Sequence, residues 1–177
     1  MPHSIEAAPS GRAKCRGCGR PIARGDLRLG VRLPNPFDAE NELTLWFHLL
    51  CGAYTRPDAF LEAATDTRQD LFEREKLESQ ARLGLEYPRL PRLRGVERAR
   101  TGRSACRSCR EAIPKDAWRI ALTFYDEVEG RFSPGGFLHL HCGKEYFGTA
   151  EIVDRLTHFT PGLERAQVEE IASALRG

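Results

Sequence analysis

The chain has 177 residues and a formal net charge of +2, and 29% of its residues are charged. This length suffices for one ordinary domain or for two small ones. No apolar run approaches the roughly 20 residues of a membrane-spanning helix, and residues 1–6 lack the apolar stretch of a secretory signal. We therefore expect a soluble, intracellular protein with no membrane partner.

Charge is distributed unevenly along the chain. Residues 12–32 contain seven basic side chains and one acid, and residues 89–119 contain ten basic side chains and three acids. Residues 58–79 show the reverse, with seven acids and three bases. For nucleic-acid binding, the placement of charge matters more than the total, so the small net charge does not exclude a polyanionic partner.

In chain order, residues 1–10 are polar and contain proline, and we expect a disordered lead. Residues 27–33 alternate strictly between apolar and other side chains, with Arg28 and Arg32 opposite the leucine and valine face, which predicts a half-buried strand. Pro34 ends this strand because proline cannot continue the hydrogen-bonded ladder. Residues 43–47 then predict a return strand.

The middle of the chain is predicted to be a helix followed by a linker. Residues 66–83 have helical periodicity, with Leu71, Phe72 and Leu77 available for an apolar face and Gly84 as a stop. Residues 88–101 contain two prolines and five arginines and form a predicted basic linker. It is either a solvated spacer or a basic arm that lies along phosphates.

The last part repeats the pattern of the first. Residues 118–124 alternate again, which predicts a strand. Its expected inward face is Trp118, Ile120, Leu122 and Phe124, and its expected outward face is Arg119, Ala121 and Thr123. Residues 126–131 predict a polar turn, and residues 135–138 lead back toward a histidine. Residues 163–175 predict a C-terminal helix that starts near Pro161.

Cysteine and histidine occur at metal-ligand spacing in both halves. The first set is Cys15, Cys18, His48 and Cys51, and every position recurs 91 residues later as Cys106, Cys109, His139 and Cys142. Four nitrogen and sulfur ligands with no open position suit tetrahedral zinc in a structural role. The two sets use all six cysteines of the chain, so we predict two Zn²⁺ ions per chain.

Three other interpretations compete with structural zinc. A disulfide framework would need an oxidising compartment, and a redox Cys-x-x-Cys would not explain the paired His-x-x-Cys. A catalytic zinc normally keeps one position open for water. His141 is adjacent to Cys142, but only His139 matches His48 in spacing, so we expect His141 to lie at the surface or to face phosphate.

These observations predict a small zinc-stabilised α+β fold. It consists of two tandem Cys3His modules, residues 11–87 and 102–177, each with a short antiparallel sheet and a C-terminal helix. Modules of this size bury too little apolar surface to rely on a core alone, and a structural zinc supplies the missing stability.

The residues around the ligands resemble the zinc finger of the poly(ADP-ribose) polymerase type. The first module has Ile22 after the Cys-x-x-Cys pair, a Leu-Arg-Leu strand around Arg28, and Trp46-Phe47 before the histidine. The second has Ile113 and Arg119 at matching offsets. Directly after the last cysteine, where the family often has an aromatic residue, this chain has Gly52 and Gly143.

Members of this family are similar in recognising DNA strand breaks rather than base sequence. The resemblance implies phosphate contacts from the arginine before the first cysteine and from the strand arginine, which are Arg12, Arg28, Arg103 and Arg119. It also implies apolar loop residues that stack on bases exposed at a break, for which the candidates are Phe37, Leu43, Val128 and Phe132. Alternatively, these apolar side chains only pin their loops to the core.

In the family, such fingers precede an ADP-ribosyltransferase or a DNA ligase, and no length remains here for either. We therefore expect a stand-alone, non-enzymatic DNA-binding protein that associates with nicks or ends. One alternative is a zinc-scaffolded protein-interaction module in a DNA repair or transcription assembly. Others are a hydrolytic zinc enzyme that uses His141, and RNA binding through exposed aromatic side chains.

Overall fold

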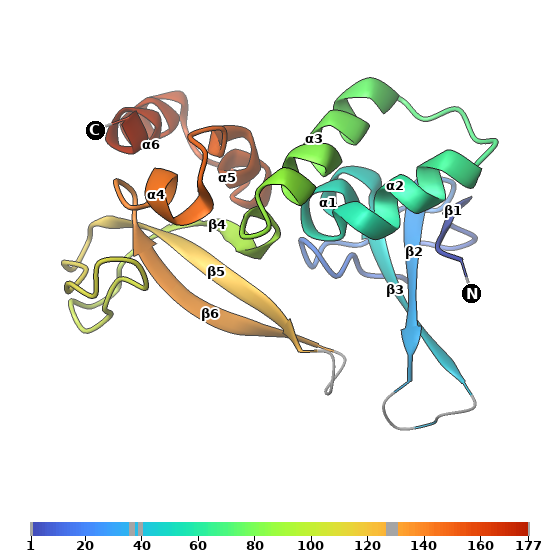
Figure 1. Cartoon of the computed structure of the whole chain (residues 1–177), viewed down its shortest axis with the longest axis horizontal. Helices are drawn as coiled ribbons and strands as arrows, with labels where there is room; N and C mark the ends of the chain where they lie inside the picture. The colour runs from blue at the N-terminus through green and yellow to red at the C-terminus, as the bar shows by residue number, and fades with distance from the viewer. Residues whose placement is uncertain (1, 36–37, 39–40, 127–130, 177) are drawn as a thin grey trace. The chain divides into compact units, whose positions relative to one another are not determined.

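The structure, a computed structural model, describes residues 2–35, 38, 41–126 and 131–176. The chain divides into two compact units (Figure 1), which are residues 1–86 with 126–131 and residues 87–125 with 132–177, and each is described by itself. Within the described residues, no helix combines the length and the apolar character needed to cross a membrane.

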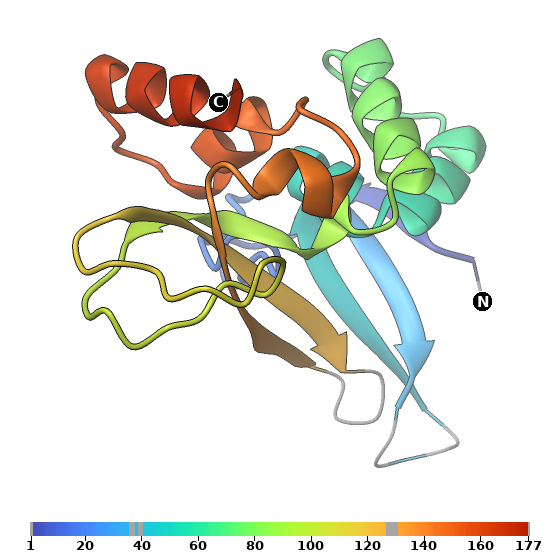
Figure 2. The same ribbon diagram turned by 60° about the vertical axis from the view of Figure 1, so that its left-hand side comes forward.

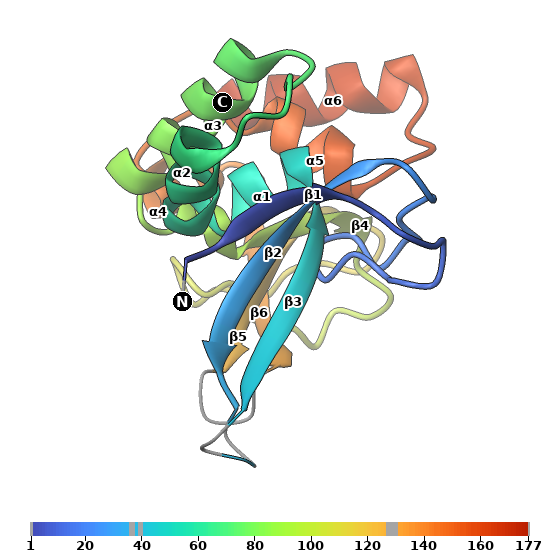
Figure 3. The same cartoon turned by 90° about the vertical axis from the view of Figure 1, so that its right-hand side faces the viewer.

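The first unit is built on a three-stranded antiparallel sheet with the strand order β1-β2-β3. Its strands are β1 (Ser4–Ala7), β2 (Leu27–Pro34) and β3 (Glu42–His48). Three helices follow: α1 (Leu49–Thr55), α2 (Pro57–Asp66) and α3 (Arg74–Glu86). In Figures 1 and 3 the hairpin of β2 and β3 extends away from these helices toward its loop.

The second unit repeats this plan with a sheet in the order β4-β5-β6. A short 3₁₀ helix, η1 (Leu90–Arg92), precedes the strands β4 (Leu93–Arg98), β5 (Trp118–Asp126) and β6 (Arg131–His139). The helices are α4 (Gly143–Phe147), α5 (Val153–Phe159) and α6 (Arg165–Arg176), and they lie on one side of the sheet in Figure 2. The two sheets and the helices confirm the predicted α+β class.

The core of each unit forms where the alternating face of the hairpin meets the helices. In the first unit Leu29 pairs with Phe47 and Val31 pairs with Leu45 across the strands, and all four are at most 2% exposed. α1 packs on β2 and β3, while α2 packs on β1 and β2. In the second unit Ile120, Leu122 and Leu138 are buried in the same way. The middle of each predicted inward face is therefore confirmed, whereas its ends are only half-buried, at Leu27, Leu33, Trp118 and Phe124.

The glycine after the last cysteine of each module permits close packing of a helix on a strand. A Cβ atom on Gly52 would lie 2.6 Å from Cδ2 of Leu29, and one on Gly143 would lie 2.9 Å from Cδ1 of Ile120. Both distances are shorter than a carbon–carbon contact allows, since such atoms pack at roughly 3.5–4.0 Å. This geometry explains why neither module has an aromatic residue at this position.

Two segments that the sequence predicted to lie outside the modules form strands. Within residues 1–10, predicted to be disordered, β1 pairs with β2 from Ser4–Gly30 to Ala7–Leu27. Within the predicted linker 88–101, β4 pairs with β5. The prediction was wrong because these strands are edge strands, whose order comes from pairing with a hairpin that lies elsewhere in the sequence rather than from their own composition. The 91-residue offset extends to them, since it relates β1 to residues 95–98.

The predicted helix over residues 66–83 is interrupted. α2 ends at Asp66 and α3 begins at Arg74, with a loop between them. The side chain of Thr67 accepts a hydrogen bond from the backbone N–H of Gln69, and Glu73 has a φ of 53°. Because a left-handed residue cannot continue a right-handed helix, Leu71 and Phe72 of the predicted apolar face lie in the loop and only Leu77 lies in a helix. The predicted stop at Gly84 is also wrong, since α3 continues to Glu86.

Candidate metal centres and nucleic-acid interface

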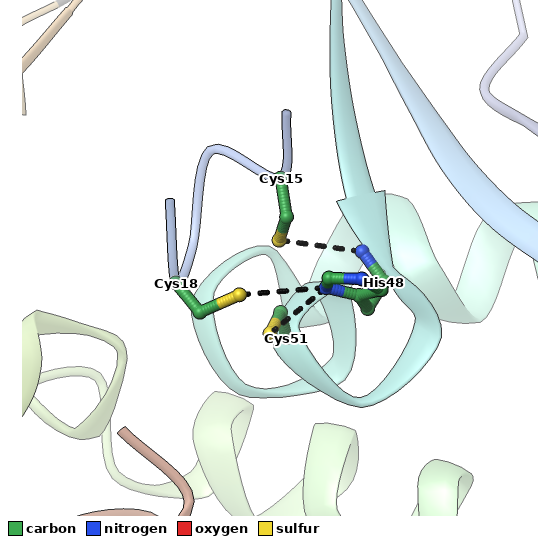
Figure 4. A group of neighbouring side chains, drawn as sticks. All are labelled: Cys15, Cys18, His48 and Cys51. Atoms are coloured by element: carbon green, nitrogen blue, oxygen red, sulfur yellow. Dashed lines mark hydrogen bonds between the residues drawn. The ribbon is translucent and has the colours of Figure 1, made fainter. Parts of the chain in front are cut away.

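Site 1 consists of Cys15, Cys18, His48 and Cys51, whose potential ligand atoms all lie within 4.8 Å of one another. Figure 4 shows the thiols of a turn and of α1 converging on the imidazole at the end of β3. The Sγ atom of Cys18 is 3.4 Å from Nδ1 of His48, and that of Cys51 is 4.0 Å from it. This arrangement brings together all four predicted ligands.

The histidine of site 1 is oriented by its second ring nitrogen. Nε2 of His48 lies 3.1 Å from the backbone oxygen of Pro21. Because a carbonyl oxygen can only accept, Nε2 carries the proton and donates, which leaves the lone pair of Nδ1 facing the thiols. A carbonyl partner of this kind fixes the ring and the tautomer of a metal-binding histidine.

The cysteine turn of site 1 is closed by backbone hydrogen bonds. The N–H of Cys15 donates to the oxygen of Arg20, and the N–H of Gly19 donates back to Cys15. Gly17 has no room for a side chain, since a Cβ atom there would lie 2.8 Å from Cβ of Cys51. The turn therefore holds two thiols on the same side as the ligand from α1.

Site 2 consists of Cys106, Cys109, His139 and Cys142 and has the same geometry. The Sγ atom of Cys109 is 3.4 Å from Nδ1 of His139, and Nε2 of His139 lies 3.2 Å from the backbone oxygen of Ala112. His141 is outside the ligand group, is exposed, and stacks on His139 with 4.8 Å between ring centroids. The predicted choice of His139 over His141 agrees with this geometry.

Three thiolates and one neutral imidazole around a point are the donor set of a closed, tetrahedral zinc site. Each group can hold one zinc ion, so the chain has two candidate zinc centres. A zinc ion bound there would cross-link a turn, a strand end and a helix in each unit, and would supply part of the folding energy.

Before a metal binds, the thiols of site 1 differ strongly in acidity. The hydrogen bond donated by the Cys51 thiol lowers the pKa of Cys15 to about 4, although burial opposes this change and backbone N–H groups of Cys18 and His48 add to it. The same hydrogen bond, together with burial, raises the pKa of Cys51. Cys15 is therefore already a thiolate at neutral pH.

The corresponding thiols of site 2 titrate differently. Burial raises the pKa of Cys106, but hydrogen bonds from backbone N–H groups, including that of His139, more than offset burial and bring its pKa to about 7. Burial and hydrogen bonds with Cys109 and Cys106 raise the pKa of Cys142 to about 12. The thiolate of Cys106 is therefore less strongly stabilised than that of Cys15.

The surroundings of the two sites also differ in charge. Nε of Arg20 donates a hydrogen bond of 3.4 Å to the thiol sulfur of Cys18, and this bond raises the pKa of the guanidinium. The residue at the same offset in the second module is Glu111, whose backbone oxygen accepts from Cys106 as that of Arg20 does from Cys15. Cys109 is exposed, whereas Cys18 is partly buried.

The four arginines implied by the family resemblance occupy two kinds of environment. Arg12 and Arg103 are exposed, each in the turn that precedes its first cysteine. Arg28 and Arg119 are 7% and 6% exposed, which corrects the expectation that they face outward into solvent. The physical reason is that each guanidinium lies between an aromatic ring and a carboxylate.

The buried arginines form the same three-residue stack in both units. The guanidinium carbon of Arg28 lies 3.5 Å from the ring centre of Trp46, and its Nη2 donates to Glu6 at 2.6 Å. That of Arg119 lies 3.4 Å from the ring centre of Phe137. Its Nε donates to Glu97 at 3.1 Å, and its Nη1 donates to Oγ of Ser104 at 2.9 Å.

Sequence reasoning missed the two carboxylates of these stacks. Glu6 and Glu97 are 91 residues apart, as are Arg28 and Arg119, and Trp46 and Phe137. Extending the repeat upstream of the cysteines would have identified them. Guanidinium groups over aromatic faces are held more firmly when water is excluded, so each stack fixes the strand arginine in one position.

The four candidate stacking residues are only partly described. Phe37 and Val128 lie outside the described residues. Leu43 is partly exposed in β3, opposite Leu33 near the end of the β2–β3 hairpin. Phe132 is partly exposed in β6 and packs edge-to-face on Tyr125 with 5.1 Å between ring centroids.

A small α+β fold that occurs twice in tandem, with a Cys3His group in each copy, defines a protein of two zinc-finger modules. No protein-family model matches the chain. It is 31% identical over 158 residues to the poly(ADP-ribose) polymerase of Drosophila melanogaster, and 27% identical over 168 residues to that of Sarcophaga peregrina. It is 29% identical over 137 residues to poly(ADP-ribose) polymerase 1 of Danio rerio.

These matches cover 80%, 80% and 70% of this chain. The chain spans only 16%, 16% and 13% of the length of these relatives. The relatives and the two Cys3His groups agree with each other, and the chain is a tandem zinc-finger protein of the poly(ADP-ribose) polymerase type.

Proposed function

We propose that this chain is a zinc-dependent DNA-binding protein that recognises strand breaks, at nicks or ends, largely independently of base sequence. The observation that carries the proposal is an exposed basic surface around each zinc site. In the first unit it consists of five side chains, Arg12, Lys14, Arg16, Arg20 and Arg24, and in the second of four, Arg103, Arg107, Arg110 and Lys115. Phosphate contacts from such residues supply affinity and position without reading sequence.

We propose that Arg12 and Arg103 contact phosphates directly because they are exposed next to the first cysteine of each module. Replacing either with alanine should weaken binding to all duplexes alike. It should also reduce the dependence of log K on log salt by about 0.9 for each phosphate that the variant no longer neutralises. A reduction in affinity that differs between base sequences would contradict this assignment.

For Arg28 and Arg119, we propose a phosphate contact that competes with their carboxylate partners. Glu6→Gln and Glu97→Gln keep the arginine and the aromatic ring but remove the negative charge that holds the guanidinium. If the arginines reach phosphate, these variants should bind DNA more tightly than the natural chain. If the stacks are only structural, the variants should lower the melting temperature and leave DNA affinity unchanged.

Recognition of a break requires side chains that contact base faces, which an intact duplex hides. We propose that Phe37, Leu43, Val128 and Phe132 stack on base faces exposed at the interruption, which is worth roughly 1–3 kcal/mol per base in single-strand binding. The test is fluorescence anisotropy of the zinc-loaded chain with a DNA dumbbell that carries one nick and with the same dumbbell ligated shut. Equal, salt-sensitive affinity for both would reduce the proposal to backbone binding.

We further propose that the chain acts by binding and not by catalysis, in association with DNA and with repair proteins as possible partners. Each candidate zinc centre already has four protein ligands, which leaves no position for a reacting water. The competing function is a zinc-scaffolded protein-interaction module in a repair or transcription assembly. This function would be favoured if neither dumbbell bound and if Arg28→Glu and Arg119→Glu did not change the affinity for DNA.

A further inference from the structure

A groove of about 450 Å³ lies beside site 1 in the first unit. One wall is the turn that leads into β2, at Asp26 and Leu27, and a second is the junction of β3 and α1, which begins at His48. The third is the segment that leads into α3 and carries Phe72. Because His48 is a zinc ligand, metal binding fixes one wall of the groove.

The apolar surface of the groove includes a phenyl ring that faces solvent. Phe72 is 86% exposed, whereas its neighbours in the apolar pattern, Leu71 and Leu77, are 3% and 6% exposed. The loop that carries Phe72 is held in place by Arg74, whose guanidinium donates to the backbone oxygens of Ala64 at 2.9 Å and of Gln69 at 3.3 Å. The ring is therefore presented by an anchored loop, next to the half-buried leucines of the β3–α1 junction.

In the second unit, an arginine and an aromatic ring of the chain itself meet at the corresponding place. At the offset of 91 residues, Leu27 is replaced by Trp118, and the guanidinium carbon of Arg98 lies 4.0 Å from a Trp118 ring centre. Arg98 also donates to the backbone oxygen of Asp116 at 3.1 Å and to Glu170 of α6 at 3.2 Å. An arginine and an aromatic ring thus bridge the turn and the last helix in the second unit.

The first unit lacks this bridge. The positions that correspond to Arg98 and Glu170 are Ala7 and Ser79, neither of which can span the space between the turn and α3. Three carboxylates line the groove, from Asp26, Asp70 and Glu73, and the single lysine among the lining residues, Lys76, is paired with Glu73 at 3.4 Å. The lining therefore carries two more negative charges than positive ones, which disfavours a phosphate and favours a cationic group.

We propose that this groove docks a segment of a partner protein that presents an arginine beside a large apolar side chain. The apolar side chain packs on Phe72 and Leu27, and the guanidinium pairs with Asp70 and Glu73. The second unit shows the chemistry of the occupant, since there the chain supplies the same pair of groups itself. The net negative charge of the groove distinguishes it from the basic surface proposed to bind DNA.

The test is a titration of the zinc-loaded, ¹⁵N-labelled full chain with synthetic peptides, followed by two-dimensional NMR. The probe is acetyl-Gly-Arg-Trp-Arg-Leu-Gly-amide. One control peptide has glutamate in place of both arginines, and a second has alanine in place of tryptophan and leucine. We expect saturable shifts of the amides of Leu27, Phe72 and Lys76 with the probe alone, at a Kd on the order of 0.1–1 mM, as suits a short and flexible ligand.

Two variants locate the binding. Phe72→Ala should weaken peptide binding at least about fivefold, because it removes an apolar wall of the groove. It should leave the fold intact, because the Phe72 side chain is largely exposed. The matched control is Leu85→Ala, which changes the other large apolar side chain that is exposed among the described residues, outside the groove, and should have no effect. Unchanged zinc content and circular dichroism establish that both variants are folded.

Several results would overturn the proposal. The first is the absence of saturable shifts up to 5 mM peptide, which is on the order of ten times the expected Kd. The second is equal binding of the probe and of the glutamate peptide. The third is binding that Phe72→Ala and Leu85→Ala weaken equally. Shifts of the same amides on dilution of the protein alone would assign the groove to a second copy of the chain. Shifts there with nicked DNA would assign it to nucleic acid. Since the titration contains no DNA, failure of strand-break recognition would leave its outcome unchanged.

Discussion

The two metal centres should differ in zinc affinity, and the difference should depend on the residues at positions 20 and 111. Arg20 lies 3.4 Å from the sulfur of Cys18 through Nε, whereas the corresponding residue of site 2 is an acid. A positive charge about 4 Å from a thiolate contributes about 1 kcal/mol at the dielectric constant of water. This solvent-screened value applies because Arg20 is exposed.

The expected changes in zinc affinity follow from removing the attraction between the Arg20 guanidinium and the Cys18 thiolate, or from replacing it with repulsion. Arg20→Ala should cost site 1 about 1 kcal/mol, which is about fivefold in zinc affinity, and Arg20→Glu should cost about 2 kcal/mol, or about 30-fold. Glu111→Arg should improve site 2 by about fivefold. In the natural chain, site 1 should therefore bind zinc about fivefold more tightly than site 2 from the Arg20 contact alone.

The assay is a titration of the zinc-loaded chain with a chelator, in which the imidazole NMR signals of His48 and His139 report the two sites separately. We expect His139 to lose its zinc-bound signal first and Arg20→Glu to reverse the order. Lys115→Ala is the matched control, because it removes an exposed positive charge that has no hydrogen bond to a ligand sulfur among the described residues. The reasoning is refuted if both sites empty together, or if Arg20→Glu and Lys115→Ala behave alike.

Three further predictions concern pH and packing. As pH falls from 7 to 5, Cys106, with a pKa of about 7, regains its proton, while Cys15, with a pKa of about 4, does not. Zinc binds the thiolate form, so zinc affinity is present at high pH and is lost as pH falls. The zinc affinity of site 2 should therefore fall about 50-fold more than that of site 1, as measured by the same titration at both pH values. Gly52→Ala should destabilise the first unit by about 1–3 kcal/mol, because its Cβ atom would meet Leu29 at 2.6 Å, whereas Gly11→Ala, with its nearest atom at 3.9 Å, should change the unfolding free energy by less than about 0.5 kcal/mol. Leu29→Ala should cost about 2–5 kcal/mol, since Leu29 is fully buried, and an unfolding midpoint in urea equal to that of the natural chain would contradict this packing.

Local sequence patterns were sufficient wherever structure depends on neighbours in the chain. Strict alternation predicted β2 and β5 within a few residues, because a strand with one buried face places every second side chain inward. The ligand sets followed from spacing, since a metal accepts few side-chain types and a short turn can present two of them together. The repeat of 91 residues indicated the tandem plan without any knowledge of packing.

Only the tertiary structure decided what depends on distant segments. β1 and β4 are short and polar at the sequence level, and they become strands because the hairpins offer unpaired edges. Arg28 and Arg119 belong to the outward face of their strands by alternation, yet Glu6 and Trp46, or Glu97 and Phe137, cover them. The groove beside Phe72 likewise depends on segments far apart in the sequence, since the turn before β2, the β3–α1 junction and the segment that leads into α3 all line it. Burial of this kind is set by which segments meet in space, and the periodicity of a single segment does not contain that information.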